Sequence, residues 1–137
     1  MGKTGCGILL ITRDERRVLL LQRGASAPAY PSHWGGPGGI QDPSDTDEVS
    51  AALRELREET GIQLHPSETL PFYEGVWEEG DGRRLVYFLT CIPLVIQVTL
   101  SWEHSDSGWF TYEEALSVPL AFHYDRAIRK LRADAIL

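Results

Sequence analysis

The chain begins with two short apolar runs, at residues 5–12 and 18–23, separated by a charged stretch at 13–17. Two such runs around a polar turn predict an antiparallel hairpin. Later apolar and β-branched runs predict four more strands, at residues 70–78, 85–92, 96–101 and 107–110. The pair Asp81-Gly82 between the first two of these runs is typical of a hairpin turn.

The segment between Thr46 and Gly61 has the periodicity of an amphipathic helix rather than a strand. Its apolar residues recur at i, i+3, i+4 and i+7 and predict one buried stripe: Val49, Ala52, Leu53 and Leu56. Asp45 or Thr46 can cap the first turn. Gly61 suits the left-handed residue that commonly ends a helix.

Two further helices are predicted near the C-terminus. Thr111 and Glu114 have the spacing of a capping box, which opens a short helix. Residues 122–135 predict a last helix, with Phe122, Ala127, Ile128 and Leu131 toward the core. A mixed sheet with a central helix and C-terminal helices predicts a sandwich of the α+β class.

Composition is that of a globular protein, with 42% hydrophobic and 24% charged residues. Its 137 residues favour one domain over 1–137. The net charge of −7 argues against a nucleic-acid partner but permits a phosphorylated ligand when divalent cations lie between the two. No apolar run predicts a membrane span or a signal peptide, so we expect a cytoplasmic protein without a membrane partner. Cys6 and Cys91 lack metal-ligand spacing, which favours reduced thiols over the alternative of a disulfide.

Three glutamates of the predicted helix lie on one side, bordering the apolar stripe: Glu55, Glu58 and Glu59. Like charges at this spacing repel one another, and a hard divalent cation with oxygen ligands removes that cost. Arg54 precedes Glu58 by four residues and can hold its carboxylate. A solvated helix face is the alternative interpretation. Four glycines at residues 35–39 precede the helix, where backbone has to pass close to another group.

These residues carry a resemblance to a known family. The segment His33-Trp34-Gly35-Gly36-Pro37-Gly38-Gly39, an acidic loop, and the run from Ala51 to Ile62 closely resemble the MutT-like Nudix hydrolases. The family signature is G-x₅-E-x₇-R-E-U-x-E-E-x-G-U, where U is a bulky aliphatic residue. Residues 54–62 match every specified position. Between Gly39 and Arg54 the chain has one residue more than the signature. The place of the signature's first glutamate therefore falls on Asp45 when counted forward from Gly39, and on Thr46 when counted back from Arg54.

The resemblance implies a Nudix α/β/α sandwich, Mg²⁺ as cofactor with Mn²⁺ as a substitute, and nucleoside diphosphate-linked substrates. It assigns metal binding to Glu55, Glu58, Glu59 and the Gly39 backbone, and an orienting role in catalysis to Arg54. The expected reaction is hydrolysis of a phosphoric anhydride, in which water attacks phosphorus and a nearby carboxylate takes its proton. Glu103, from a later loop, is the candidate for that base, and the helix glutamates Glu58 and Glu59 are expected to be catalytic as well.

Glu103 has alternative roles as a further metal ligand or an ordinary surface residue, and His104 is a weaker candidate base. Arg23 and Arg83 are candidates to contact phosphate, and Arg23 is the better of the two because it ends a strand near the glycines. The favoured expectation for Arg83 and Arg84 is a solvated hairpin end. Trp34 is a candidate to stack on a substrate base, as are Tyr73, Trp77, Phe88 and Phe122. Packing in the core is the favoured alternative for each, because aromatic residues in strands usually pack.

Subfamily motifs favour nucleoside triphosphates or damaged nucleotides by elimination. The place of the proline typical of ADP-ribose members holds Trp77, and the place of the tyrosine typical of diadenosine polyphosphate members falls in residues 78–80. The rival hypotheses are a catalytically silent Nudix-like binding domain and a purely structural module. Monomer and homodimer are both compatible with the sequence.

Overall fold

The computed structural model describes residues 3–137, so the first two residues of the expected domain lie outside the described range. Its elements in chain order are β1 (Thr4–Thr12), β2 (Val18–Arg23), β3 (Trp34–Gly35), β4 (Gly38–Ile40), α1 (Glu48–Thr60), a 3₁₀ turn η1 (Pro66–Glu68), β5 (Leu70–Val76), β6 (Arg84–Ile92), β7 (His104–Phe110), α2 (Tyr112–Leu116) and α3 (Tyr124–Ala133).

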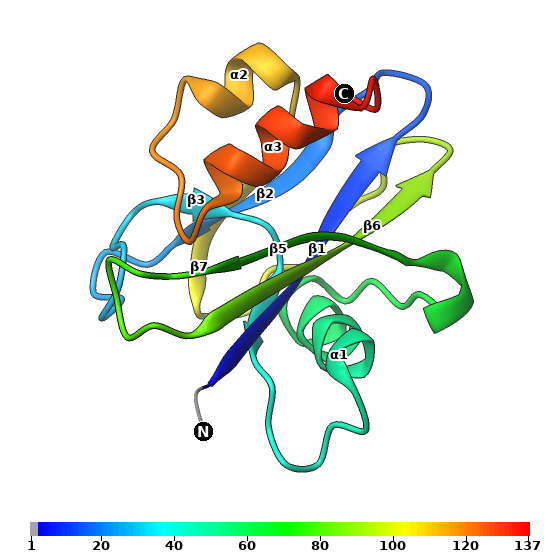
Figure 1. The fold of residues 1–137 in the computed structure, drawn as a ribbon. Coiled ribbons are helices and arrows are strands. Elements are labelled where there is room, and N and C mark those ends of the chain that lie inside the picture. The colour runs from blue at the N-terminus through cyan, green and yellow to red at the C-terminus, as the bar shows by residue number, and fades with distance from the viewer. Residues whose placement is uncertain (1–2) are drawn as a thin grey trace.

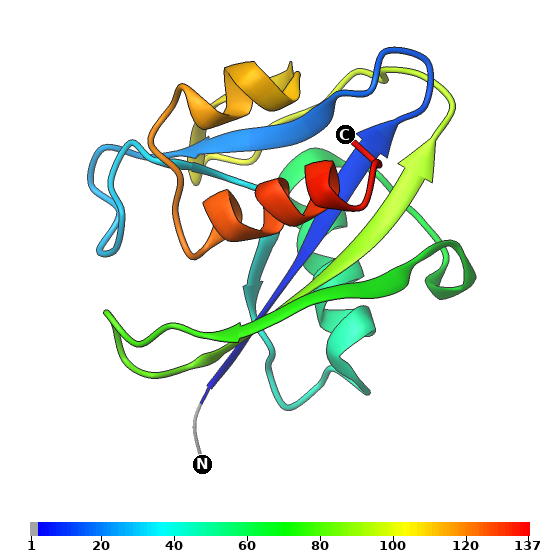
Figure 2. The same cartoon turned by 45° about the horizontal axis from the view of Figure 1, so that its top comes forward.

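A mixed sheet separates α1 on one face from α2 and α3 on the other (Figures 1 and 2). Its main strand order is β3-β2-β1-β6-β5, with β4 added to β1 and β7 to β2. β1 runs parallel to β6 along its whole length and antiparallel to its other partners. The predicted α+β sandwich is confirmed.

The alternation of side chains along β1 builds two separate cores, because successive residues of a strand point to opposite faces. Leu9 and Ile11 pack with the α2 and α3 layer. Ile8 and Leu10 pack with α1, against residues such as Leu56. A strand buried on both faces reads as a continuous apolar run, which is why residues 5–12 show so little polarity.

The predicted hairpin of β1 and β2 forms and then opens. The two strands are paired at Ile11 and Val18, next to the turn. Farther along, β1 pairs with β4, with Cys6 opposite Gly39, while β2 pairs with β3, with Leu21 opposite Gly35. The glycine-rich segment therefore crosses from one strand to the other, and the sheet is divided where α1 approaches it.

Helix α1 begins two residues later than predicted. Asp47, rather than Asp45 or Thr46, is its N-cap and accepts a hydrogen bond from the Ser50 N–H at 2.8 Å. Asp45 is occupied elsewhere, by Arg54 at 2.9 Å. Gly61 ends the helix at φ 78°, as expected for a left-handed cap.

The strand predicted at 96–101 is wrong, because this segment lies in a loop between β6 and β7. The reason is a competing set of partners at the end of α1. The last carbonyls of a helix lack partners within the helix. Here Thr99 N–H donates to the Thr60 carbonyl and Ser101 N–H to the Glu59 carbonyl, both at 3.1 Å. The loop is thus fastened to the helix instead of extending the sheet.

The remaining elements differ from the predictions at their ends. The β5–β6 hairpin and the Thr111 capping box are confirmed. β7 begins three residues before the predicted strand. α3 begins at Tyr124 because Phe122 and His123 are both left-handed, at φ 47° and 64°. Such backbone is costly for residues other than glycine and persists only where the surroundings hold it.

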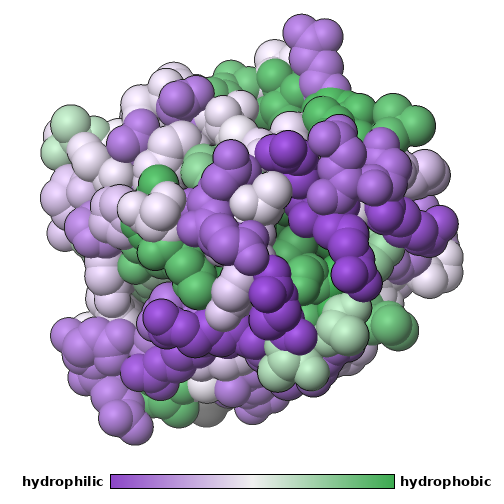
Figure 3. All heavy atoms as spheres, turned by 90° about the horizontal axis from the view of Figure 1, so that it is seen from above, coloured by the Kyte–Doolittle hydropathy of each residue, from purple (hydrophilic) through white to green (hydrophobic). Residues whose placement is uncertain are grey.

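The surface on the side of α2 and α3 is mainly hydrophilic, with apolar side chains showing between the polar ones (Figure 3). Within residues 3–137, no helix is long and apolar enough to cross a membrane. Cys6, which is buried, and Cys91, which is partly buried, are both free thiols.

Candidate active site

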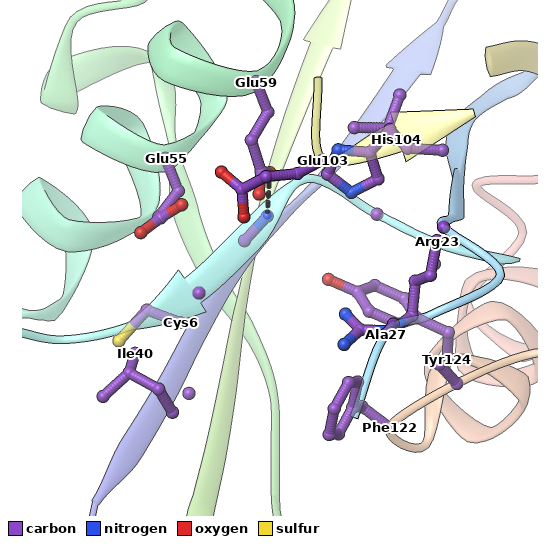
Figure 4. Close-up of a pocket in the computed structure, with 18 of the residues that line it drawn as sticks. Cys6, Arg23, Ala27, Ile40, Glu55, Glu59, Glu103, His104, Phe122 and Tyr124 are labelled. Carbon is purple, nitrogen blue, oxygen red and sulfur yellow. Dashed lines mark hydrogen bonds between the residues drawn. The ribbon is translucent and has the colours of Figure 1, made fainter. Parts of the chain in front are cut away.

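A pocket of about 660 Å³ opens where the sheet divides. Its walls come from the N-terminal part of β1, the end of β2, the glycine-rich segment, α1, the loop before β7 and the start of α3. Figure 4 shows three glutamates turned toward one part of this pocket, while Arg23 and Phe122 lie on the other side. The pocket therefore has an acidic end and a basic, aromatic end.

Glu55 and Glu59 form the helix side of the acidic end. Glu59 is 3% exposed and accepts a hydrogen bond from the Gly38 N–H at 2.8 Å. Burial is the main cause that raises the pKa of Glu59 to about 9, with the negative charges of Glu55 and Glu103 adding to it. Burial also raises the pKa of Glu55, against the lowering effect of Arg54. Glu59 is therefore expected to be neutral at physiological pH unless a cation lies beside it.

Gly38 and Gly39 lie where the β4 backbone passes very close to other groups of the protein. A Cβ on Gly39 would lie 2.5 Å from the Glu55 carboxylate, and one on Gly38 would lie 2.5 Å from the Cys6 carbonyl oxygen. Real Cβ atoms do not come this near to other heavy atoms. A side chain on Gly38 would push β4 away from β1, and one on Gly39 would displace the Glu55 carboxylate. The Gly39 backbone, predicted as a metal contact, lies in the pocket wall beside Glu55.

Arg54 joins the acidic loop to the helix. Its guanidinium contacts both oxygens of Asp45 at 2.9 Å, and this carboxylate is only 5% exposed. The hydrogen bonds from Arg54 are the main cause that lowers the pKa of Asp45. Arg54 also donates to Glu55 at 3.0 Å and to Glu58 at 3.2 Å. Of Asp45 and Thr46, the two candidates for the first glutamate's place, Asp45 is therefore the one that ties the loop to the helix.

Glu58 does not line the pocket with the other two helix glutamates. Its side chain is 51% exposed and is held by Arg54. Within the described part of the chain, no three acidic, histidine or cysteine side chains are close enough to form a complete metal cage. The metal role of Glu58 stays a prediction.

Glu103 and His104 complete the acidic end from the opposite side. Both line the pocket, and the backbone just before them is fastened to α1 through Ser101. The His104 Nδ1 is buried without a hydrogen-bond partner in residues 3–137. Burial is the main cause that lowers the pKa of His104, and the nearby positive charge of Arg23 adds to it.

Two arginines and an aromatic ring form the other end. The Arg23 guanidinium carbon lies 5.0 Å from the centre of the Phe122 ring, and that of Arg83 lies 5.7 Å from it. Burial is the main cause that lowers the pKa of Arg23. Arg83 is 18% exposed and lines the pocket, so the expectation of a solvated hairpin end is wrong for this residue. A guanidinium on an aromatic ring is a stable arrangement, which draws Arg83 inward.

Trp34, the predicted base-stacking residue, lies outside the pocket wall. Its ring packs on Phe110, with ring centres 5.0 Å apart, at the edge of the core under α3. The reason is the alternation of β3, because Gly35 lines the pocket and its neighbour Trp34 does not. Trp102, which the sequence pattern did not single out, lines the pocket and is 92% exposed.

The acidic end fits a divalent metal ion by its chemistry. Mg²⁺ and Mn²⁺ prefer carboxylate and carbonyl oxygens as ligands. Burial disfavours the ionised form of Glu55 and Glu59, and a bound cation would stabilise that form. The negative charge of Glu103 lies near both of them. A cation at this end would offset the desolvation of Glu55 and Glu59 and the repulsion between their charges and that of Glu103.

The α/β/α sandwich and the buried acidic pocket next to a glycine-rich segment agree with the expected class of hydrolases, and comparison with known proteins confirms that class. The family model described as NUDIX domain matches residues 2–131. The chain belongs to the Nudix family, and the predicted hydrolase of phosphoric anhydrides is confirmed at the level of this family.

Several relatives match most of the chain. The asymmetrical bis(5′-nucleosyl)-tetraphosphatase of Caenorhabditis elegans is 36% identical over 134 residues, which are 93% of this chain and 92% of that protein. The CTP pyrophosphohydrolase of Escherichia coli is 33% identical over 82% of this chain and 78% of that protein. A crystal structure of a C. elegans Ap4A hydrolase binary complex has a TM-score of 0.73 and 27% identity, over 96% of this chain and 95% of that one.

Other matches are partial. The m7GpppN-mRNA hydrolase NUDT17 of Danio rerio is 38% identical over 74 residues, and the match covers 54% of this chain but only 24% of that protein. The matched part of the chain therefore spans about a quarter of the length of this relative.

Proposed function

We propose that residues 1–137 are one Nudix domain that hydrolyses a phosphoric anhydride bond in a nucleotide, with Mg²⁺ as cofactor and Mn²⁺ as a substitute. The observation that carries this proposal is the polarity of the pocket. Buried carboxyls at one end suit a metal ion, and arginines at the other end suit phosphate oxygens. A chain of phosphates extending between the two ends satisfies both.

The metal would be held by Glu55, Glu59 and the Gly39 backbone, with Glu58 from the exposed side of α1. A bound divalent ion polarises phosphoryl oxygens and lowers the pKa of water. The chain itself orients these ligands. The Gly38 N–H fixes Glu59, and Arg54 fixes Glu55 and Glu58.

Three carboxylates are candidates to accept the proton of the attacking water, namely Glu103, Glu58 and Glu59. Glu103 has the advantage of position, because it reaches the acidic end from a different element than α1 (Figure 4). Arg23 and Arg83 would contact the part of the phosphate chain farther from the metal. Guanidinium groups there neutralise charge and fix the orientation of the substrate.

The proposed substrate is a nucleotide with a chain of at least three phosphates. Elimination among subfamily motifs favours nucleoside triphosphates and their damaged forms. Support for a long phosphate chain comes from the names of two relatives that match most of the chain, one a tetraphosphatase of dinucleosides and one a CTP pyrophosphohydrolase. Dinucleoside polyphosphates therefore join the candidates. Cytoplasmic location, absence of a nucleic-acid partner, and a monomeric or homodimeric state stay predictions.

The test is hydrolysis of ATP, GTP, CTP, modified triphosphates, diadenosine tetraphosphate and ADP-ribose, with Mg²⁺, with Mn²⁺ and with EDTA. We expect metal-dependent turnover and a loss of kcat by at least about a hundredfold in Glu58→Gln, since stabilisation of transition-state charge by a metal is worth several kcal/mol. The matched control is Glu113→Gln on α2, an exposed glutamate paired with Arg132. Equal activity of Glu58→Gln and Glu113→Gln would refute the metal role of Glu58. No turnover of any substrate would favour a silent binding domain.

A further inference from the structure

Trp102 is the most exposed large apolar side chain of the described residues, at 92%. The other three tryptophans each have partners within the protein. Trp34 packs on Phe110, Trp77 packs on Phe122 with ring centres 4.9 Å apart, and the Trp109 indole N–H donates to the Ile96 carbonyl at 3.2 Å. An indole left in water forgoes the stabilisation that its burial would bring.

The position of Trp102 is set by the same contacts that place the acidic end. Ser101 N–H donates to the Glu59 carbonyl at 3.1 Å, so the residue before Trp102 is tied to the glutamate helix. Glu103, the residue after it, lines the acidic end. Trp102 itself lines the pocket. The exposed indole is therefore held at the mouth of the pocket beside its carboxylates, and not on an unrelated surface.

A nucleotide offers the group that would cover this ring. Its phosphates are drawn to the metal and the arginines, while its base has a flat, apolar face that stacks on aromatic side chains. We propose that Trp102 stacks on the nucleobase of the substrate and contributes to its affinity. The inference rests on the proposed function, because it takes the substrate to be a nucleotide with its phosphates at the acidic end.

The stacking role makes a separable prediction about ligands with and without a base. Trp102→Ala should weaken binding of methylene-bridged analogues of ATP, GTP or CTP by about tenfold or more, the effect expected from loss of one base–aromatic contact. Inorganic tripolyphosphate, which has no base, should bind both proteins equally. Trp102→Phe should recover most of the affinity, since a smaller aromatic ring still stacks.

The measurement is calorimetric titration of wild type and variants with Mg²⁺ present, together with tryptophan fluorescence. Emission of the wild type should change on binding, and this change should be lost in both Trp102 variants. Leu94→Ala is the matched control, because Leu94 lies in the same loop and is 55% exposed but does not line the pocket. It should bind like wild type.

Two results would overturn the inference. One is nucleotide affinity of Trp102→Ala within twofold of wild type for every base. The other is an equal loss of nucleotide and tripolyphosphate affinity, which would show that the indole supports the loop rather than the base. Binding is measured without turnover, so the two proposals can fail separately. A wild type that binds these analogues but cleaves nothing in the panel would refute the proposed function, while the comparison of Trp102 variants would still test the stacking contact.

Discussion

Glu59 allows the acidic end of the pocket to be tested without any substrate. Its carboxyl is 3% exposed, and burial raises its pKa from 4.5 to about 9. The Gly38 N–H and Arg23 act in the opposite direction but do not cancel the effect of burial. In protein freed of metal, Glu59 therefore stays protonated at neutral pH in the folded state and ionises on unfolding.

This difference links stability to pH. Below pH 4.5 both states hold the proton, so Glu59 imposes no penalty. As the pH rises above 4.5 the unfolded state loses the proton first, and the free energy of unfolding falls by about 1.4 kcal/mol for each pH unit until the pH nears 9. Between pH 5 and pH 8 the loss is roughly 3 to 4 kcal/mol.

The perturbation is Glu59→Gln, which keeps an oxygen to accept from Gly38 and removes the titration. The assay is urea unfolding of wild type and variant in EDTA at several pH values from 5 to 8. We expect the wild type to lose roughly 3 to 4 kcal/mol relative to the variant over this range. Titrating groups that do not interact with Glu59 are common to both proteins and cancel.

Metal should reverse this loss in the wild type. Mg²⁺ or Mn²⁺ binds the folded state, displaces the proton and raises the melting temperature, most strongly at pH 8, and Glu59→Gln should show a much smaller rise. A stability difference between the two proteins that does not change with pH in EDTA would refute the desolvation of Glu59. The same thermal shift in both proteins would refute its role as a ligand.

Two further predictions concern residues around the helix. Asp45→Asn should lower the free energy of unfolding by about 2 kcal/mol, because it breaks the bidentate pair with Arg54. Asp42→Asn should lower it by well under about 1 kcal/mol, since Asp42 contacts the same guanidinium at 3.4 Å and is 45% exposed. Equal effects of the two substitutions in urea unfolding would contradict this reasoning. If Glu103 is the base, Glu103→Gln should lower kcat, with partial recovery at high pH. If Glu103 is a metal ligand, the variant should need more Mg²⁺ to reach a similar kcat. A kcat that matches wild type across both the pH series and the Mg²⁺ series would show that Glu103 has neither role.

Local pattern determined much of this protein from sequence alone. The apolar stripe of residues 49–56 and the stop at Gly61 predicted α1, because periodicity and backbone handedness are properties of neighbouring residues. The match at residues 54–62 identified the family, and with it the helix glutamates. Glu55, Glu59, Glu103 and Arg23 all line one pocket, although they come from three elements far apart in the chain.

Tertiary contacts decided what local pattern left open. Both Asp45 and Asp47 can cap a helix, and Arg54 settled the choice by binding Asp45. Residues 96–101 have the composition of a strand, but the free carbonyls at the end of α1 took their N–H groups. In both cases two partners compete for one polar group, and the winner is set by which of them the fold brings near.

The same holds for the aromatic residues of the site. Trp34 lies next to the glycines in sequence, yet the alternation of β3 turns it toward Phe110 and the core. Trp102 has no motif around it and reaches the pocket because its loop is fastened to α1. Sequence determines which faces of helices and strands are apolar, since that depends on spacing alone. Which side chain meets the substrate depends on where distant segments cross, and only the folded chain decides that.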